Sequence, residues 1–361
     1  MSKKVLVGMS GGVDSSVSVA LLLEQGYEVI GAFMKNWSDG EDKEECSWRT
    51  ERRDAMRVAA QLGIELLTFD FEDEYRQHVY DYMIEEYKAG RTPNPDVLCN
   101  KYMKFGFLLR EAEKLDCDFI ATGHYARTKV DDDGTTHLLA GVDGNKDQSY
   151  FLCRLNQDQL KKTLFPIGDI EKPAVREKAR ELDLVVADKK DSQGICFVGK
   201  VKMQDFLAER IPEQPGNIVT LEGEVIGTHK GYAYYTIGQR SGLGIGGGTP
   251  YFVIERRPES NEVVVVLGED HPALLSNALE AVDLTTTVDG GESIIHDREL
   301  LTRIRYRQPL QTCRVSSDDH GRLTVVFDEP QQAVAPGQFI AFYQGDELVG
   351  SAVIDKAIKI S

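Results

Sequence analysis

A run of glycines and serines near the start of the 361-residue chain suits the binding of phosphate. It reads Ser10-Gly11-Gly12-Val13-Asp14-Ser15-Ser16 and lies between an apolar run and a helical pattern. Glycines let the backbone curl around an anion, hydroxyls donate to phosphate oxygens, and a helix N-terminus supplies free N–H groups and a positive dipole end. Because the lysine of the usual P-loop is missing, we expect a phosphate-binding loop of another kind.

The thiol groups are the second candidate for chemistry. No two of the six cysteines have the C-x-x-C spacing typical of zinc and redox motifs, so neither zinc nor an iron–sulfur cluster is expected. Free cysteines are usually small buried residues. Two cysteines lie in more distinctive surroundings. Cys99 ends the run Asn94-Pro95-Asp96-Val97-Leu98-Cys99 before a predicted helix, and Cys196 lies in a glycine-containing loop after Asp191.

The first half of the chain alternates between strand and helix patterns. Strands are predicted at 5–9, 29–34, 66–71 and 119–121, and helices at 16–23, 53–62, 73–88 and 102–115. Such alternation predicts an α/β domain with a doubly wound parallel sheet. Ligands bind such sheets at the carboxyl ends of the strands, where the Ser10 loop is expected.

Beyond about residue 200 the chain carries short β-rich runs separated by Gly, Pro and Asn. They lie at 232–237, 251–254, 263–267, 323–327 and 339–343, with a break near His271-Pro272. We therefore predict three domains: the nucleotide-binding domain at 1–200, a small β-rich middle domain at 201–270 and a C-terminal β-barrel at 271–361.

Charge and hydropathy limit the classes of function. The formal net charge is −17, which argues against binding a polyanion over the whole surface. Local basic regions remain at 145–180 and at Arg303, Arg305 and Arg307, whose period of two would place three guanidinium groups on one strand face. No apolar run approaches the ~20 residues of a membrane helix, and no signal-peptide pattern opens the sequence. We expect a cytoplasmic protein with no membrane partner.

The Ser10, Asn94 and Asp191 runs together resemble the three signatures of bacterial tRNA-specific 2-thiouridylases, a family of PP-loop ATP pyrophosphatases. The likeness extends through Ala121-Thr122-Gly123-His124-Tyr125, Lys146-Asp147-Gln148-Ser149-Tyr150-Phe151-Leu152, Tyr235-Thr236-Ile237-Gly238-Gln239-Arg240 and Ala335-Pro336-Gly337-Gln338. It implies ATP-dependent 2-thiolation of the wobble uridine of tRNA. In that reaction the C2 oxygen is adenylated, and sulfur from a cysteine persulfide then replaces it.

The resemblance also implies roles for single residues. Cys196 would carry the persulfide, and Cys99 would be the partner nucleophile that forms a disulfide with it. The implied ATP contacts are Gly8, Met9, Ser10, Gly11, Gly12, Val13, Asp14, Ser15, Met34 and Gly123. The implied tRNA contacts are Asn94, Pro95, Asp96, His124, Lys146, Asp147, Gln148, Arg305, Tyr306 and Gln338. The implied partners are ATP with Mg²⁺, the anticodon region of tRNA, and a persulfide-donating relay protein or cysteine desulfurase.

Plainer interpretations exist for several of these residues. Without the resemblance, Met34 is more often a core residue, Asn94-Pro95-Asp96 is a turn signal, and Asp14 caps a helix as readily as it holds Mg²⁺. Two other classes of protein also fit the loop. One is a synthetase that activates a small carboxylate or carbonyl, which needs neither Cys99 nor Cys196. The other is a noncatalytic RNA-binding module with a vestigial nucleotide loop.

Overall fold

The computed structural model describes residues 2–38, 47–191, 203–246, 248–296 and 298–360. Its first sheet is parallel, with the strand order β3-β2-β1-β4-β7. The strands are β1 (Lys4–Gly8), β2 (Glu28–Lys35), β3 (Glu65–Asp70), β4 (Phe119–Ala121) and β7 (Thr163–Leu164). The chain winds outward from β1 to β3 and then returns to place β4 on the other side of β1. The carboxyl ends of β1 and β4 therefore flank the switch point where such sheets bind ligands.

Helices cover both faces of this sheet, as the alternation of buried residues along β1 requires. Val5 and Val7 pack in one apolar cluster with α1 (Val13–Glu24), α2 (Ser47–Leu62) and α8 (Lys172–Glu181). Leu6 points to the opposite cluster, which contains residues of two longer helical stretches. These stretches comprise α3 (Glu72–Tyr75), η1 (Arg76–Tyr80) and α4 (Asp81–Lys88), and then α5 (Pro95–Leu98), η2 (Cys99–Phe107) and α6 (Leu108–Lys114). The predicted α/β class is confirmed.

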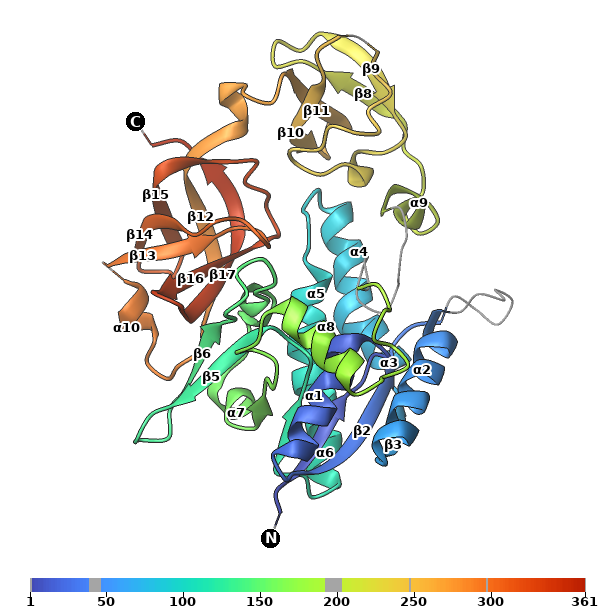
Figure 1. Ribbon diagram of the computed structural model, residues 1–361. Coiled ribbons are helices and arrows are strands. Elements are labelled where there is room, and N and C mark those ends of the chain that lie inside the picture. Colours follow the sequence, from blue (N-terminus) through green and yellow to red (C-terminus); the bar gives the residue numbers. More distant parts are fainter. Residues whose placement is uncertain (1, 39–46, 192–202, 247, 297, 361) are drawn as a thin grey trace.

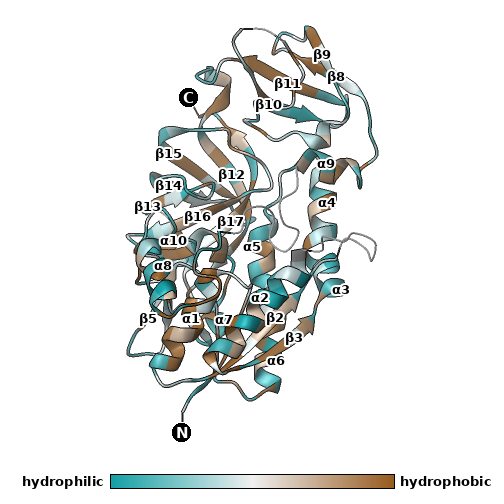
Figure 2. Cartoon of the chain, turned by 45° about the vertical axis from the view of Figure 1, so that its right-hand side comes forward, coloured by the Kyte–Doolittle hydropathy of each residue, from teal (hydrophilic) through white to brown (hydrophobic). Residues whose placement is uncertain are grey.

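The C-terminal part is a closed six-stranded barrel. Its strands follow the order β12-β15-β14-β13-β16-β17, and β12 also pairs with β17, which closes the sheet. They are β12 (Leu275–Thr286), β13 (Glu299–Arg303), β14 (Gln311–Ser317), β15 (Leu323–Gln332), β16 (Phe339–Gln344) and β17 (Glu347–Ile358). Figure 2 shows apolar residues on these strands and on the central sheet, whereas α2 and α6 carry hydrophilic residues. The predicted β-barrel is confirmed.

A hairpin from the N-terminal half extends the barrel sheet. It consists of β5 (Ala126–Val130) and β6 (Thr136–Ala140), and β6 pairs with β17 through Leu139 opposite Glu347 and Leu138 opposite Leu348. Figure 1 shows this hairpin beneath the barrel, beside β16 and β17. The sequence analysis assigned no strands here. The hairpin lies close to the barrel in space although it is far from it in sequence.

The middle domain is a four-stranded sheet with the order β10-β11-β8-β9. Its strands are β8 (Gly216–Val219), β9 (Val225–His229), β10 (Tyr251–Arg257) and β11 (Glu262–Leu267). The strand predicted at 232–237 is wrong, because this segment contains the 3-10 turn η4 (Tyr232–Tyr234). The hydroxyl groups of Tyr232 and Tyr234 donate to the backbone oxygens of Lys88 and Ile211, each at 2.6 Å. These tyrosines anchor a turn to neighbouring segments instead of pairing in a sheet.

The remaining elements are short connections. They are η3 (Ser149–Leu152), α7 (Gln157–Leu160), α9 (Met203–Ala208), η5 (Pro272–Leu274) and α10 (Glu292–Ile295). Among the helices that the structure describes, none has the length and apolar character needed to span a bilayer.

Candidate functional site

The glycine and serine loop follows β1 and leads directly into α1. Gly11 has φ 70°, and a Cβ atom there would lie 2.2 Å from the backbone oxygen of Glu51, so only glycine fits. The Ser15 hydroxyl accepts from the Ser10 N–H at 3.3 Å and donates to the Gly12 oxygen at 3.3 Å. Gly12 is the N-cap, and no side chain caps α1. The first N–H groups of this helix are thus available to an anion.

Residues from the neighbouring strands come close to this loop. Gly123 follows β4, and a Cβ atom there would lie 2.7 Å from the Ser15 nitrogen, so its lack of a side chain lets the backbone approach the first turn of α1. Met34 lies near the end of β2. Its methyl group lies 3.7 Å from where a Cβ atom at Gly8 would be. Met34 is buried in the core, which is consistent with its plainer interpretation. Its contact with adenine stays a prediction.

Asp14 is held by two donors from distant segments. The ammonium of Lys172 lies 2.7 and 2.8 Å from its two carboxylate oxygens, and the Tyr125 hydroxyl donates to it at 2.8 Å. Burial and the Asp14 carboxylate raise the pKa of Tyr125 well above its usual range. Asp14 does not cap the helix. The carboxylate has acceptor sites beyond those that Lys172 and Tyr125 occupy, and its contact with a magnesium ion stays a prediction.

The same ammonium joins Asp14 to a second carboxylate. Asp191 contacts Lys172 at 2.8 Å and also Lys146 and Arg176, each at 2.7 Å. Burial alone would raise the pKa of Asp191, but hydrogen bonds from Lys146 and Lys172 outweigh it, and the pKa lies below its usual range. Lys146 was predicted as a tRNA contact, whereas Lys172 and Arg176 were seen only as members of a basic region. The structure places all of them around one carboxylate.

The Cys99 segment begins with a capped turn. Asn94 caps α5 by accepting from the Val97 N–H at 3.3 Å, with Pro95 at the first helical position. The Asn94 amide also donates to the Gln338 side-chain oxygen at 3.2 Å. Two predicted tRNA contacts that are 244 positions apart in sequence therefore lie side by side. Cys99 follows α5 and is buried.

Thr92 connects this turn to both β domains. Its N–H donates to the Pro336 oxygen at 2.7 Å, and its own backbone oxygen accepts from the Gln338 amide at 3.0 Å. Its hydroxyl accepts from Arg256, a buried side chain of β10, at 2.8 Å. Burial lowers the pKa of Arg256 to about 10. Thr92 and Arg256 cannot be identified from the sequence, because neither belongs to a motif and their contact is long-range.

Three further predicted tRNA contacts have partners within the protein. His124 is buried and lies 2.7 Å from the Thr122 hydroxyl through Nδ1, and burial together with Lys104 lowers its pKa well below the usual value. Asp147 is buried and pairs with Arg303 at 3.1 Å. Gln148 accepts from the Tyr125 N–H at 3.0 Å. These side chains thus have partners within the protein, and their contact with RNA stays a prediction.

The three arginines at 303, 305 and 307 do not share a strand face, which corrects the sequence interpretation. β13 ends at Arg303, whose side chain is buried, whereas Arg305 and Arg307 are exposed in the following turn. Arg307 has φ 62°, which is incompatible with a continuing strand. Tyr306 lies between them and packs on Phe151 with 4.5 Å between ring centroids. The side chains of this turn are therefore split between the core and the surface.

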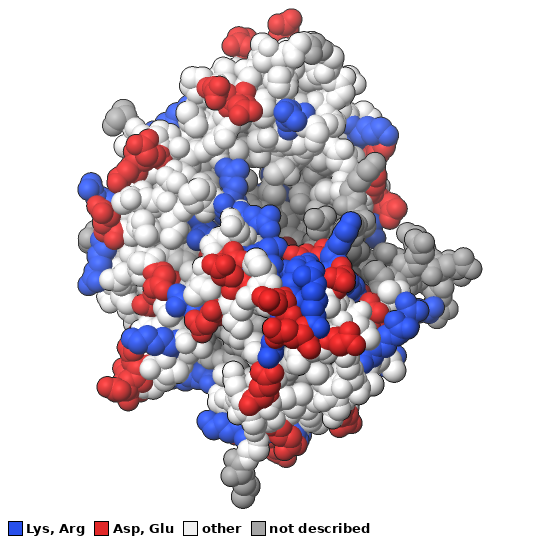
Figure 3. Space-filling model, viewed as in Figure 1, with Lys and Arg blue, Asp and Glu red and all other residues white. Residues whose placement is uncertain are grey.

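The other described thiols are Cys153 and Cys313, which are buried, and Cys117, which is half-buried. Burial raises the pKa of Cys153 to about 11 and that of Cys313 to about 12, so both stay protonated at neutral pH. Burial also raises the pKa of Cys117. Cys46 and Cys196 lie outside the described residues. Figure 3 shows Lys and Arg side chains beside a hollow on the face that it presents, with Asp and Glu side chains among them.

The fold and the loop together define a chain of the nucleotide-binding parallel-sheet class with two β domains. The family described as the tRNA methyl transferase HUP domain matches residues 3–200. The tRNA methyl transferase PRC-barrel domain matches 204–267, and the aminomethyltransferase beta-barrel domain matches 290–354.

Curated relatives narrow this class to one family. A tRNA-specific 2-thiouridylase MnmA from Klebsiella pneumoniae is 50% identical over 364 residues, covering 99% of this chain and 98% of the relative. One from Shewanella denitrificans is 49% identical over 363 residues, covering 99% and 97%. A solved 4-thiouridine synthetase–RNA complex with bound ATP is 16% identical with a TM-score of 0.35, and covers 58% of this chain and 50% of that chain. The chain belongs to the tRNA-specific 2-thiouridylase family.

Proposed function

We propose that this chain catalyses the ATP-dependent 2-thiolation of the wobble uridine of tRNA, with AMP and pyrophosphate as the other products. The observation that carries the proposal is the uncapped N-terminus of α1 behind the Gly11 turn, at the switch point of the sheet. Full-length similarity to 2-thiouridylases supports uridine in tRNA as the target. We further propose 1–200, 201–270 and 271–361 as the domains, and the cytoplasm as the compartment.

The chemistry requires activation of a poor electrophile. The C2 carbonyl of uracil loses its oxygen reluctantly, because the ring nitrogens feed electron density into the carbon. In the first proposed step the C2 oxygen attacks the α-phosphorus of ATP, and pyrophosphate leaves. The donors of the Ser10 loop are suited to bind the phosphates, as helix N-termini stabilise negative charge.

Sulfur transfer then needs two thiols. The terminal sulfur of a Cys196 persulfide attacks C2, and AMP leaves with the former carbonyl oxygen. The Cys99 thiolate attacks the inner sulfur, so that the S–S bond breaks, the thiocarbonyl remains on the base and a Cys99–Cys196 disulfide forms. A persulfide-donating relay protein or a cysteine desulfurase would reload Cys196 after reduction.

The RNA side of the proposal rests on the Asn94 turn and the Arg305 turn. Asn94, Pro95 and Asp96 offer donors, acceptors and a stiff backbone next to Cys99, which suits a flipped pyrimidine. Arg305 and Tyr306 combine an exposed charge with an aromatic ring, which suits an unstacked anticodon.

The direct test is nucleoside mass spectrometry of unmodified tRNA after incubation with the protein, ATP, magnesium, and a cysteine desulfurase with cysteine as the persulfide donor. We expect 2-thiouridine together with stoichiometric AMP. Absence of 2-thiouridine would overturn the proposal. Absence of pyrophosphate release as well would favour a noncatalytic RNA-binding module.

Variants of the thiols separate this function from a PP-loop synthetase. Cys196→Ser should bind ATP and tRNA but accept no persulfide, whereas Cys99→Ser should accept one and fail to discharge it. Cys117→Ser is the matched control, because this half-buried thiol has no proposed role and should leave turnover unchanged. If ATP-to-AMP turnover survives the loss of both Cys99 and Cys196, the result favours a synthetase and contradicts thiolation.

A further inference from the structure

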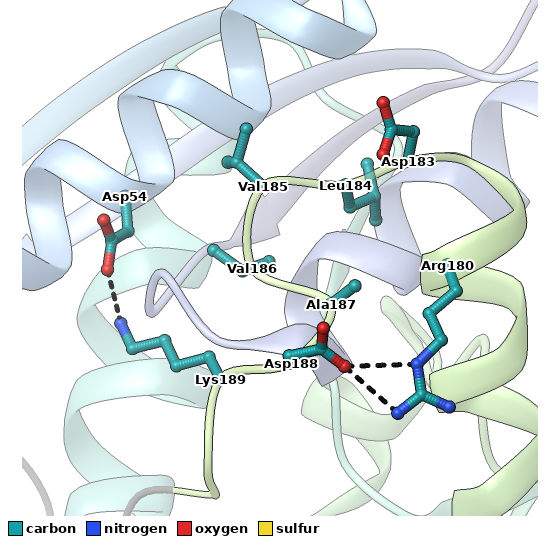
Figure 4. A pocket seen from close by; sticks show the side chains of 9 residues that line it. All are labelled: Asp54, Arg180, Asp183, Leu184, Val185, Val186, Ala187, Asp188 and Lys189. Carbon is teal, nitrogen blue, oxygen red and sulfur yellow. Dashed lines mark hydrogen bonds and ion pairs between the residues drawn. The ribbon is translucent and has the colours of Figure 1, made fainter.

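A second ammonium group reaches the phosphate-binding loop. The Nζ atom of Lys189 donates to the backbone oxygen of Gly11 at 2.8 Å and pairs with the Asp54 carboxylate at 2.7 Å. Lys189 lies 178 positions after Gly11, beyond the end of α8, and Asp54 lies on α2. Figure 4 shows the ammonium of Lys189 extended toward Asp54. The contact therefore connects three segments that meet only in the folded protein.

This contact sets the orientation of one peptide group in the loop. In a trans peptide the C=O and the following N–H point in opposite directions. A cation that holds the Gly11 oxygen therefore directs the Gly12 N–H away from Lys189. Two consecutive glycines are otherwise the most mobile backbone in the loop, because neither has a side chain to restrict it.

We propose that Lys189 is a positioning residue that holds the Gly11–Gly12 peptide in the orientation that binds phosphate, and that Asp54 in turn holds Lys189. The inference rests on the proposed use of ATP and adds a residue to it. A usual P-loop contains its lysine within the motif. Here the loop lacks one, and a lysine from a distant segment contacts its backbone.

The surroundings of Lys189 provide a matched control. Lys189 and Asp54 line an open pocket of about 460 Å³, together with Arg180 and Asp188. Arg180 pairs with Asp188 at 3.1 Å, and both side chains are largely exposed. The two ion pairs share a pocket wall (Figure 4), but only the Lys189 pair contacts the loop. Arg180→Met thus removes a cation from the same pocket without changing the Gly11 peptide.

The experiment compares equilibrium binding of MgATP and of adenosine by the full-length parent and its variants. Lys189→Met should weaken MgATP binding about tenfold, as expected for loss of a hydrogen bond to a charged group. The affinity for adenosine should stay within about twofold of the parent value, because adenosine has no phosphate to contact the Gly12 N–H. Lys189→Arg should restore most of the MgATP affinity, and Arg180→Met should bind like the parent.

Asp54→Asn separates positioning from simple charge attraction. Removing a negative charge near the phosphates would strengthen MgATP binding if Lys189 acted only through its charge. If Asp54 holds Lys189 in place, the same substitution should weaken MgATP binding about threefold. Stronger binding by Asp54→Asn, or parent-like binding by Lys189→Met, would overturn the inference.

Two controls keep the outcomes distinct. A parent that binds no MgATP would contradict the proposed function itself, whereas a parent that binds it with unaffected variants would contradict only the role of Lys189. Thermal melting checks the fold of each variant. If Lys189→Met fails to fold, the comparison of Asp54→Asn with Arg180→Met decides the question alone.

Discussion

The phosphate-binding loop and the Asn94 turn are the two parts of the proposed site, and they are held by different kinds of contact. Around the loop the long-range contacts are charged: Lys172 pairs with Asp14, and Lys189 holds Gly11 and Asp54. Around the turn they are neutral or involve a single buried cation: Gln338 and Pro336 come from the barrel, and Arg256 comes from the middle domain.

These two kinds of contact predict which changes should affect the loop and which should affect the Asn94 turn. Charged contacts within one domain respond to pH and to substitutions that alter charge. Hydrogen bonds between domains respond to anything that moves one domain against another. We therefore expect variants that affect nucleotide binding and RNA use separately.

Gly123→Ala should give the largest separation. A Cβ atom at this position would lie 2.7 Å from the Ser15 nitrogen, a backbone atom that cannot rotate away, so the first turn of α1 must move. We expect AMP formation to fall by about 100-fold, with a loss of about 1–3 kcal/mol in the free energy of unfolding, as for overpacked sites. Affinity for tRNA should stay within about threefold. Gly144→Ala is the control, since nothing lies within 4 Å of its added Cβ atom. Parent-like AMP formation by Gly123→Ala would show that this approach is not needed.

Gln338→Ala should impair the Asn94 turn without affecting the phosphate-binding loop. The substitution removes two bonds of 3.0 Å to the backbone oxygens of Thr92 and Pro93, and one of 3.2 Å with Asn94. Losing such partly buried bonds should lower 2-thiouridine formation about tenfold while MgATP affinity is unchanged. Gln344→Ala, at the exposed end of β16, should be neutral. Equal losses in MgATP binding and thiolation would contradict the separation.

Arg305→Gln should have a smaller effect that depends on salt. If the exposed guanidinium contacts a tRNA phosphate, the slope of log affinity against log salt should decrease in magnitude by about 0.7–0.9. Lys146→Gln should change the slope less, because the Lys146 ammonium must first leave Asp191 at 2.7 Å. Filter binding of tRNA over a range of salt concentrations measures both slopes. The control is Arg314→Gln on β14, and a slope equally changed in all three variants would remove Arg305 and Lys146 from the contacts.

The smallest expected effect is the pH dependence of stability at Asp191. Because the folded protein lowers the pKa of this carboxyl, its stabilising contribution is present above the ordinary value of 3.8 and is lost as pH falls through the lower folded value. The parent should therefore exceed Asp191→Asn in free energy of unfolding by a constant amount between pH 7 and 5. The difference should shrink as the pH falls below 3.8. Urea titrations at four pH values measure it, and a difference that grows toward acid would reverse the assigned direction.

The loop and the α/β alternation could be predicted because their signals are local. Gly11, Ser15 and the start of α1 lie within a few residues of one another, so motif and geometry coincide. The contacts of Lys172 and Lys189 with the loop could not be predicted, since their partners lie more than 150 positions away. Tertiary anchoring also overrode the local β signal at 232–237, where tyrosines of high β propensity hold a turn.

For the candidate tRNA contacts, residue type indicates which chemistry a side chain offers but does not indicate whether that side chain is exposed. Asp147 and His124 are polar and occur in motif-like runs, yet both are buried. Exposure depends on which elements pack above a residue, as Arg303 does above Asp147, and that information is spread along the whole chain. Among the candidate contacts Arg305 is exposed, and it lies beyond the end of β13.

The pairing of β6 with β17 affects how the chain can fold during its synthesis. β6 emerges from the ribosome early, whereas its partner strand β17 follows about 200 positions later. Until β17 is made, the outer edge of the hairpin presents unpaired backbone groups, which are prone to pair with other chains. A nascent or truncated chain without β17 should therefore expose an aggregation-prone strand edge at β6, although the rest of its N-terminal domain is complete. The final residues of the barrel would protect the solubility of an N-terminal domain that was translated long before them.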